Sequence, residues 1–268
     1  MIGRLRIFSR TKNNKRKLFI GTSGWVYYDW EGIFYPKNLN SKDKLKYFSS
    51  YFKTTEINYS FYHLPRPDTY QNWYKITPAD FVFAVKASRF ITHIKHLRGI
   101  KEAWELFLGN ALNLKEKLGP ILFQFPPSFK SNTENIKRLE EFLNYITFLR
   151  LSKKKYFTEL KFAFEFRDKS WCDEKTYNLL KKYNASWVIA DSSNYPKAEV
   201  VTADFVYIRM HGPKVLFSSK YEKEELQDLA KKIKKWLASA SVYVYFNNDI
   251  HGYAIENARE LIGLCEEF

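Results

Sequence analysis

Short apolar segments of this sequence repeatedly end in a charged or amide side chain, and these polar groups are its candidates for chemistry. In the segment 162–167, Glu165 and Arg167 alternate with three phenylalanines, so a strand would place the two kinds on opposite faces. The segment 206–211 alternates in the same way and carries Arg209. Burying an unpaired charge costs several kcal/mol, so this placement predicts either a function or a charge partner. The polar set is Glu56, Asn58, Lys86, Gln124, Glu165, Arg167, Asp191, Arg209, His211 and Asn247.

Two chemistries follow from this set. The cations Lys86, Arg167 and Arg209 could clamp a phosphate or carboxylate, with arginine supplying bidentate contacts. A carboxylate could act as general base if burial raises its pKa toward neutrality. The catalytic candidates are Glu165, Asp191, Glu56 and His211. An ion-pair network with a purely structural role at the ends of the strands is the alternative explanation, because three acidic residues of the set balance three basic ones. The acidic residues are Glu56, Glu165 and Asp191, and the basic ones are Lys86, Arg167 and Arg209.

A divalent metal is a third possibility. Glu165, Asp191 and His211 could bind it, with Asn58 or Asn247 as a weak additional ligand. The neighbouring lysine and arginine side chains would repel a cation. We therefore assign no metal ligand, and a divalent metal is not favoured. The sequence does not identify a cofactor.

Aromatic and small residues add further candidates for substrate contact. Tyr27, Tyr62 and Trp171 follow predicted strands and could stack on bases or sugars, whereas most other aromatics nearby are expected to pack as a cap. Ser23 lies in the small-residue stretch 21–24, which suits close approach of an anion. No phosphate-binding loop, dinucleotide-binding fingerprint or nucleophile elbow is found.

These side chains need a scaffold that brings strand ends together, and the order of elements predicts one. Apolar strand-like runs alternate with helical patterns, which is typical of parallel β/α units. Eight such runs in 268 residues predict a closed (β/α)₈ TIM barrel, whose active sites lie at the carboxyl ends of the strands. The apolar faces of the strands would meet the helices, and the whole polar set, Asp191 included, would line the barrel interior. The predicted strands are Leu18–Ser23, Thr55–Ser60, Phe81–Ala87, Pro120–Phe125, Lys161–Arg167, Ser186–Asp191, Phe205–His211 and Ser241–Asn247.

One unit of this barrel is expected to be irregular. The chain between Asp191 and Phe205 is too short for a normal crossover helix, so a loop is predicted in the sixth unit. No linker divides the sequence after residue 17. We therefore predict a basic N-terminal extension at residues 1–17 and a single TIM-barrel domain at residues 18–268.

The charge of the chain favours anionic partners. Its net charge is +15, and residues 1–17 contain seven basic residues and no acidic one. Such a balance attracts a small anion or a nucleic acid through a salt-dependent interaction, although for the basic extension we favour a solvated tail as the explanation. The two cysteines fit no disulfide framework, and no apolar run has the length of a membrane helix. We expect a cytoplasmic protein without a membrane partner, and predict no oligomeric state.

The chain also resembles the YecE-like family of uncharacterised TIM-barrel proteins. The matching segments extend in order from residue 18 to about residue 262, and the basic extension lies outside them. The resemblance implies the barrel fold and no established activity. The segments are 21–25, 56–58 with 61–62, 83–86 with 91–93, 118–124, 165–167 with 170–171, 190–192, 207–212, and 245–248 with 252–254.

This barrel is similar in outline to those of the xylose-isomerase and endonuclease-IV type, which hold metals with carboxylates and histidines. Glu165, Asp191 and His211 could match such a site, but Asn247 stands where a carboxylate is wanted. Our leading hypothesis is a hydrolase- or isomerase-like enzyme that acts on an anionic, phosphate-bearing substrate, with a nucleic-acid phosphodiester as one option. The alternatives are a non-catalytic nucleic-acid-binding barrel and a metal-dependent sugar isomerase or hydrolase.

Overall fold

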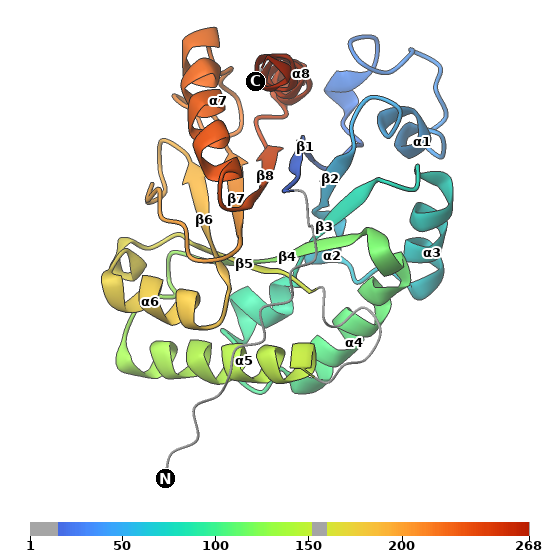
Figure 1. Ribbon diagram of the computed structural model, residues 1–268. Helices are drawn as coiled ribbons and strands as arrows, with labels where there is room; N and C mark the ends of the chain where they lie inside the picture. The colour runs from blue at the N-terminus through green and yellow to red at the C-terminus, as the bar shows by residue number, and fades with distance from the viewer. Residues whose placement is uncertain (1–15, 152–159, 268) are drawn as a thin grey trace.

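The computed structural model describes residues 16–151 and 160–267, and within them eight parallel strands form a closed barrel (Figure 1). Each strand pairs with the next along the chain, and β1 pairs with β8 to close the ring. The predicted TIM barrel is therefore confirmed. The strands are β1 Leu18–Ser23, β2 Thr54–Ile57, β3 Val82–Lys86, β4 Leu118–Phe125, β5 Phe162–Phe166, β6 Ser186–Asp191, β7 Phe205–Met210 and β8 Ser241–Phe246.

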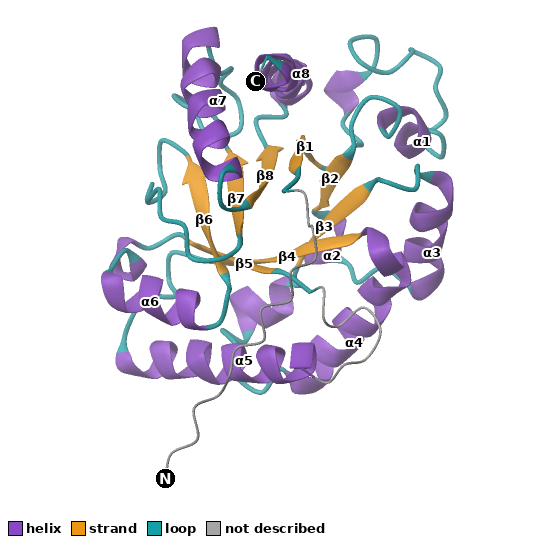
Figure 2. Cartoon of the chain, viewed as in Figure 1, coloured by secondary structure: helices purple, strands orange, loops and turns teal. Residues whose placement is uncertain are grey.

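Helices surround the strands on the outside of the barrel (Figure 2). The α-helices are α1 Lys44–Phe48, α2 Tyr59–Tyr62, α3 Pro67–Ile76, α4 Lys101–Ala111, α5 Thr133–Leu151, α6 Glu174–Lys182, α7 Lys223–Leu237 and α8 Tyr253–Glu266. The shorter helical turns are η1 Tyr28–Trp30, η2 Phe90–Ile94, η3 Leu112–Lys117, η4 Lys169–Trp171 and η5 Ile250–Gly252. Residues 192–204, which join β6 to β7, contain no helix, so the predicted irregularity of the sixth unit is confirmed.

The alternation within the strands separates two cores. Outward-facing phenylalanines pack beneath the helices, and Phe164 of β5 stacks on Phe123 of β4 with ring centroids 5.1 Å apart. The opposite face fills the barrel with a second, smaller cluster. Polar side chains lie above that cluster, toward the carboxyl ends of the strands. The inner cluster is Phe19, Ala84, Leu122, Ala163, Val188, Phe205, Tyr207, Tyr243 and Tyr245.

Several strands end earlier than predicted. The small-residue stretch 21–24, whose first three residues end β1, has a packing role. A Cβ atom on Gly21 would lie 2.1 Å from the carbonyl oxygen of Thr54, so close contact between β1 and β2 requires glycine there. Four candidate site residues are the first residues after their strands, where parallel strands direct them to one end of the barrel. They are Asn58, Arg167, His211 and Asn247.

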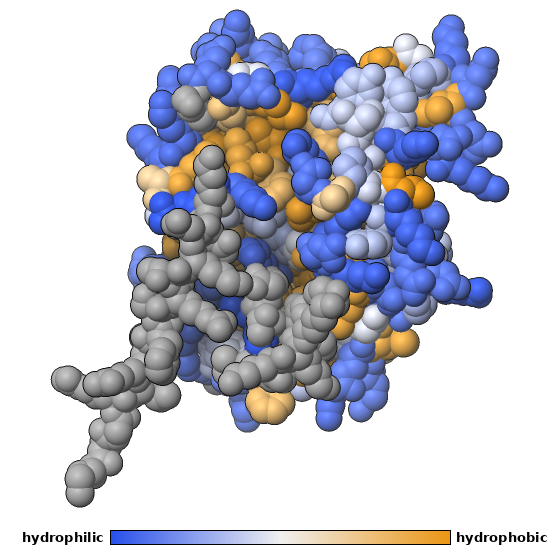
Figure 3. All heavy atoms as spheres, turned by 45° about the vertical axis from the view of Figure 1, so that its right-hand side comes forward, coloured by the Kyte–Doolittle hydropathy of each residue, from blue (hydrophilic) through white to orange (hydrophobic). Residues whose placement is uncertain are grey.

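The face of the molecule shown in Figure 3 is mostly hydrophilic, with an apolar area in its upper half. None of the helices in the described part of the chain combines the length and the apolar character that crossing a bilayer requires. Cys172 and Cys265 are both unpaired, and a reducing compartment stays a prediction. Most of the predicted basic extension, residues 1–15, lies outside the described residues.

Candidate functional site

A cavity of about 770 Å³ opens at the carboxyl ends of the strands, and we call it the mouth cavity. Its volume is in the range of sites that hold small molecules. Among the described residues that line it, the basic side chains are Lys86, Arg89, Arg167 and Arg209, and the acidic ones are Asp29 and Asp249. The cavity therefore has more basic than acidic groups on its walls.

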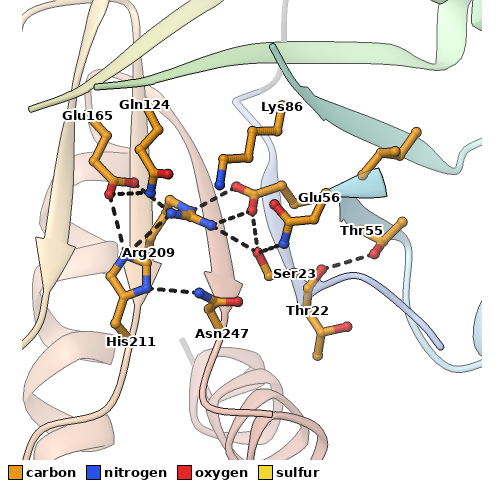
Figure 4. Close-up of polar contacts among 12 residues, drawn as sticks. Thr22, Ser23, Thr55, Glu56, Lys86, Gln124, Glu165, Arg209, His211 and Asn247 are labelled. Atoms are coloured by element: carbon orange, nitrogen blue, oxygen red, sulfur yellow. Dashed lines mark hydrogen bonds and ion pairs between the residues drawn. The ribbon is translucent and has the colours of Figure 1, made fainter. Parts of the chain in front are cut away.

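Arg209 forms the centre of the cavity floor. Its Nε and Nη2 donate to the two oxygens of Glu56 at 3.0 and 2.7 Å, and its Nη1 donates to Glu165 Oε2 at 2.7 Å (Figure 4). Nη2 also donates to the Ser23 hydroxyl oxygen at 3.2 Å. We call these four residues the floor network. Because Glu56, Glu165 and Arg209 are at most 1% exposed, each charge depends on the others for its stabilisation.

The floor network holds its two carboxylates in the ionised form. Burial alone would raise the pKa of Glu56, but the Arg209 charge and hydrogen bonds from Arg209, Ser23 and Tyr207 lower it. Burial is likewise outweighed at Glu165, whose pKa is held well below its usual range by Arg209, His211 and Arg167. A carboxylate in this state is a weak base. The condition for a general base, a pKa raised toward neutrality by burial, is therefore not met by Glu56 or Glu165.

Lys86 approaches the same floor from β3 and differs from Arg209 in having no acidic partner. Its Nζ lies 4.1 Å from the centroid of the Phe61 ring, and no carboxylate in the described part of the chain forms an ion pair with it. Burial, and then the charge of Arg209, lower the pKa of Lys86 to about 7, against the opposing effect of Glu56 and Glu165. The amine is therefore poised between its charged and neutral forms near neutral pH.

Arg167 and His93 extend the basic wall above the floor. Arg167 donates from Nε to Glu165 Oε1 at 3.1 Å, and its guanidinium carbon lies 4.1 Å from the centroid of the Tyr195 ring. Burial and the charges of Lys86, Arg167 and Arg89 lower the pKa of His93 to about 4, so its ring is neutral at pH 7. Arg167 thus presents a planar, oriented guanidinium to the cavity.

Asp249 is a site residue that the sequence reasoning missed. It follows β8 by three positions and lines the mouth cavity, and its buried Oδ1 has no hydrogen-bond partner among the described residues. Burial raises its pKa to about 8, although the Tyr27 hydroxyl and the Arg209 charge act in the opposite direction. A carboxyl group with this pKa is mostly protonated at pH 7. A rule that extended the polar set into the loops after the strands would have included it.

We predict that Asp249→Asn changes the pH dependence of stability in a defined direction. The folded-state pKa lies above the unfolded value of 3.8, so the wild type loses stability as the pH rises toward about 8. The variant lacks this loss. Its free energy of unfolding, relative to that of the wild type, should therefore increase by up to about 1.4 kcal/mol per pH unit between pH 4 and pH 8. Urea unfolding at several pH values measures the difference.

Asp68→Asn is the matched control for that experiment, because Asp68 is exposed and forms no ion pair among the described residues. Its difference from the wild type should stay constant with pH. A constant difference for Asp249→Asn as well would show that the carboxyl group ionises normally in the folded protein.

The prediction that Asp191 lines the barrel interior is wrong. Val188 belongs to the inner cluster, and by the two-residue period of a strand Asp191 points to the opposite side. There its carboxylate accepts a hydrogen bond from the Tyr221 hydroxyl at 3.0 Å and pairs with Lys197. Asp191 therefore lies on the helical side of β6, away from Glu165 and Arg209.

The three aromatic candidates have different environments. Trp171 is fully buried, stacks on Phe166 at 4.5 Å and donates from its indole nitrogen to the Phe129 carbonyl at 2.6 Å, so the prediction that it contacts a ligand is wrong. Tyr62 is 71% exposed and lines the mouth cavity. Tyr27 also lines it, while its hydroxyl donates to the Ser23 carbonyl.

The remaining candidates support the floor network. Gln124 donates from Nε2 to Glu165 Oε1 at 2.8 Å, and Asn58 donates from Nδ2 to the Ser23 hydroxyl at 3.0 Å. Ser23 itself donates to Glu56.

His211 and Asn247 lie beside the floor network. His211 is buried and lies 3.8 Å from Glu165 Oε1, and its Nδ1 is 3.0 Å from the Asn247 amide nitrogen (Figure 4). The structure thus brings together every predicted polar residue except Asp191.

The ligand set considered for a divalent metal does not converge. Asp191 faces away from Glu165 and His211, and the Arg209 guanidinium lies directly against Glu165. In residues 16–151 and 160–267, no group of three or more His, Cys, Asp or Glu side chains is arranged to hold a metal ion.

Comparison with known proteins shows which chains share this barrel. Residues 19–267 match the family described as "Protein of unknown function DUF72". The chain is 28% identical over 284 residues to the UPF0759 protein YunF of Bacillus subtilis (strain 168), an alignment that covers 93% of this chain and 95% of that protein. The resemblance to an uncharacterised family is confirmed at this level, and the finer YecE-like name stays a prediction.

Solved structures of two such proteins have the same fold. A DUF72 family protein (TM1631) of Thermotoga maritima MSB8 superposes with a TM-score of 0.79 at 28% identity, covering 93% of this chain and 99% of that one. A DUF72 family protein (EF0366) of Enterococcus faecalis V583 superposes with a TM-score of 0.75 at 22% identity, covering 94% and 98%.

Proposed function

Because the chain belongs to the DUF72 family, whose description gives no activity, we propose a function from the site alone: an enzyme that binds a small phosphate-bearing substrate in the mouth cavity. One observation carries this proposal. The floor carboxylates are already paired with Arg209, whereas Arg167 gives only its Nε to Glu165 and Lys86 forms no ion pair with a described residue, and both line the cavity. An anion is the ligand that complements them.

Arg167 is the residue best suited to hold the phosphate. Only its Nε is engaged by a carboxylate among the described residues, and its guanidinium plane is fixed against Tyr195. A fixed guanidinium offers two parallel N–H groups to a phosphate, which gives both affinity and orientation. Lys86 contacts the substrate from the floor, and Arg89 adds positive charge at the cavity wall.

The assignment as an enzyme rests on two groups whose pKa values are displaced toward neutrality. Asp249 has a pKa of about 8 and Lys86 a pKa of about 7, and both line the mouth cavity. Groups with such values can donate or accept a proton near pH 7, and they concentrate in active sites. We assign the proton transfer to Asp249 and Lys86, in place of Glu165 and Asp191.

We predict that Arg167→Met weakens binding of inorganic phosphate at least about tenfold, because a hydrogen bond to a charged group contributes about 1.5–3 kcal/mol. Isothermal titration calorimetry of the full chain at pH 7 measures the dissociation constant. Lys181→Met is the control, since Lys181 is exposed in the last turn of α6 and removing it changes the net charge equally. Equal binding by both variants would contradict the proposal.

The same variants separate this proposal from surface binding of nucleic acid. If the mouth cavity is the site, Arg167→Met weakens phosphate binding while removal of residues 1–17 leaves it unchanged. If a fluorescent single-stranded oligonucleotide binds strongly and salt-dependently to Arg167→Met but not to the truncated chain, the protein is a nucleic-acid-binding barrel instead.

A further inference from the structure

Lys86 differs from the other buried lysines of the described chain in what its amine contacts. Lys117 donates to the carbonyls of Tyr74 and Thr77 at 2.6 and 2.7 Å, and Lys44 pairs with Glu31 at 2.8 Å. These contacts explain the burial of both. Lys86 is 8% exposed and no carboxylate or carbonyl of the described chain accepts from its Nζ. Its burial has no comparable structural explanation.

The position of Lys86 is nevertheless fixed. Its backbone carbonyl accepts a hydrogen bond of 2.6 Å from the Ser60 hydroxyl, and its side chain extends from the last residue of β3 beside the Phe61 ring. The Nζ therefore lines the mouth cavity together with Arg167, the residue that we assign to the substrate anion, and the two groups are close enough for the Arg167 charge to lower the pKa of Lys86. We infer that a substrate held by its phosphate at Arg167 has its other end within the cavity that this amine lines.

We propose that Lys86 is a nucleophilic catalytic residue that forms an imine with an aldehyde or ketone carbon of an anionic substrate. This inference deepens the proposed function and rests on it, because the anion held at the cavity wall delivers the carbonyl group to the amine. The substrate class is then a small carbonyl compound that carries a phosphate or carboxylate.

The charges around the amine are compatible with this role. Arg209 approaches from β7, Glu56 from β2, Glu165 and Arg167 from the end of β5, and His93 from η2. Their opposing effects leave burial as the main influence, which lowers the pKa of Lys86 to about 7. A desolvated lysine beside another cation is an activated nucleophile, since a large fraction of the amine is neutral at pH 7.

The reaction is balanced without an oxidant or a reductant. The Nζ lone pair forms a C–N bond to the carbonyl carbon as the C=O π electrons move to oxygen. The nitrogen loses protons, the oxygen gains them, and the oxygen leaves as water when the C=N bond forms. The protonated carboxyl group of Asp249, which lines the same cavity, is suited to donate a proton to the departing oxygen.

The test is reductive trapping on the full chain at pH 7. Dihydroxyacetone phosphate and, separately, pyruvate are incubated with the protein and sodium cyanoborohydride, and modified lysines are mapped by peptide mass spectrometry. We expect Lys86 to be modified on the order of tenfold or more faster than exposed lysines, because an amine with a pKa of about 7 has a far larger neutral fraction at pH 7 than an ordinary lysine. Lys117 should also react slowly, because its amine is held by hydrogen bonds to two carbonyls. Excess inorganic phosphate should slow the modification, and Lys181→Met should leave it unchanged.

Two measurements keep this inference separate from the proposed function. If neither ketone modifies Lys86 while calorimetry shows phosphate binding that depends on Arg167, the imine proposal is overturned and the anion site stands. Modification that is spread evenly over exposed lysines also overturns it. If Lys86 is trapped but inorganic phosphate neither binds nor protects, the reactive amine stands and the phosphate-binding function fails.

Discussion

Replacing Arg209 by methionine is expected to lower the free energy of unfolding by about 3–5 kcal/mol, because the change leaves buried carboxylates without their counter-charge. Glu56 and Glu165 are both at most 1% exposed, and Arg209 donates three hydrogen bonds to them. Urea unfolding at pH 7 measures the loss. The loss should shrink as the pH falls, since protonation neutralises the stranded carboxylates.

The triple variant Glu56→Gln, Glu165→Gln, Arg209→Met tests the cause of that loss. Removing both carboxylates together with the arginine should restore much of the stability, because no uncompensated charge then remains buried. A triple variant that is even less stable than Arg209→Met would show that packing, and not charge balance, explains the effect.

Lys86→Met is expected to raise the free energy of unfolding, whereas Arg209→Met lowers it. The same variant should abolish the trapping reaction. The pKa of Lys86 is about 7 in the folded protein against 10.5 for an ordinary lysine, so the folded state holds this proton less firmly than the unfolded chain does. The wild type therefore loses stability as the pH falls from 10.5 to about 7. The variant avoids this loss, and below pH 7 it should be more stable on the order of 3–5 kcal/mol.

The pH dependence distinguishes this cause from better apolar packing. The advantage of Lys86→Met in the free energy of unfolding should decline as the pH rises above about 7 and nearly vanish above pH 10. Lys181→Met, which removes an exposed charge, should show no such trend. A stabilisation of Lys86→Met that is equal at pH 6 and pH 10 would contradict the low pKa of Lys86. A gain in stability at the expense of function is the behaviour of a residue retained for its chemistry.

The barrel and the inward direction of most of its polar groups could be predicted from the sequence, because both follow from the two-residue period of strands. Glu165 and Arg209 share a face with Ala163 and Tyr207, and these small and aromatic residues fill the interior below them. The prediction failed for Asp191, which was chosen as the last polar residue of its strand. Val188 faces the interior, so the two-residue period places Ala190 on the same face and Asp191 on the helical side.

The remaining errors concern contacts between distant segments, which strand periodicity does not describe. The indole of Trp171 is satisfied by the carbonyl of Phe129, which lies 42 residues away in the sequence. The pairing of Arg209 with Glu56 spans 153 residues, so the sequence alone left open whether this arginine binds an anion or completes a network. Asp249 was missed because it lies in the loop after β8, just before a turn in which His251 has a φ of 61°.

The most direct test of the anion site is a crystal structure of the full chain soaked with tungstate, a phosphate analogue with a strong anomalous signal. We predict an anomalous peak inside the mouth cavity, within hydrogen-bond distance of Arg167 and in contact with Lys86, and its loss in crystals of Arg167→Met. Tungstate bound only at exposed lysines, with the mouth cavity free of it at saturating concentration, would contradict the proposed function.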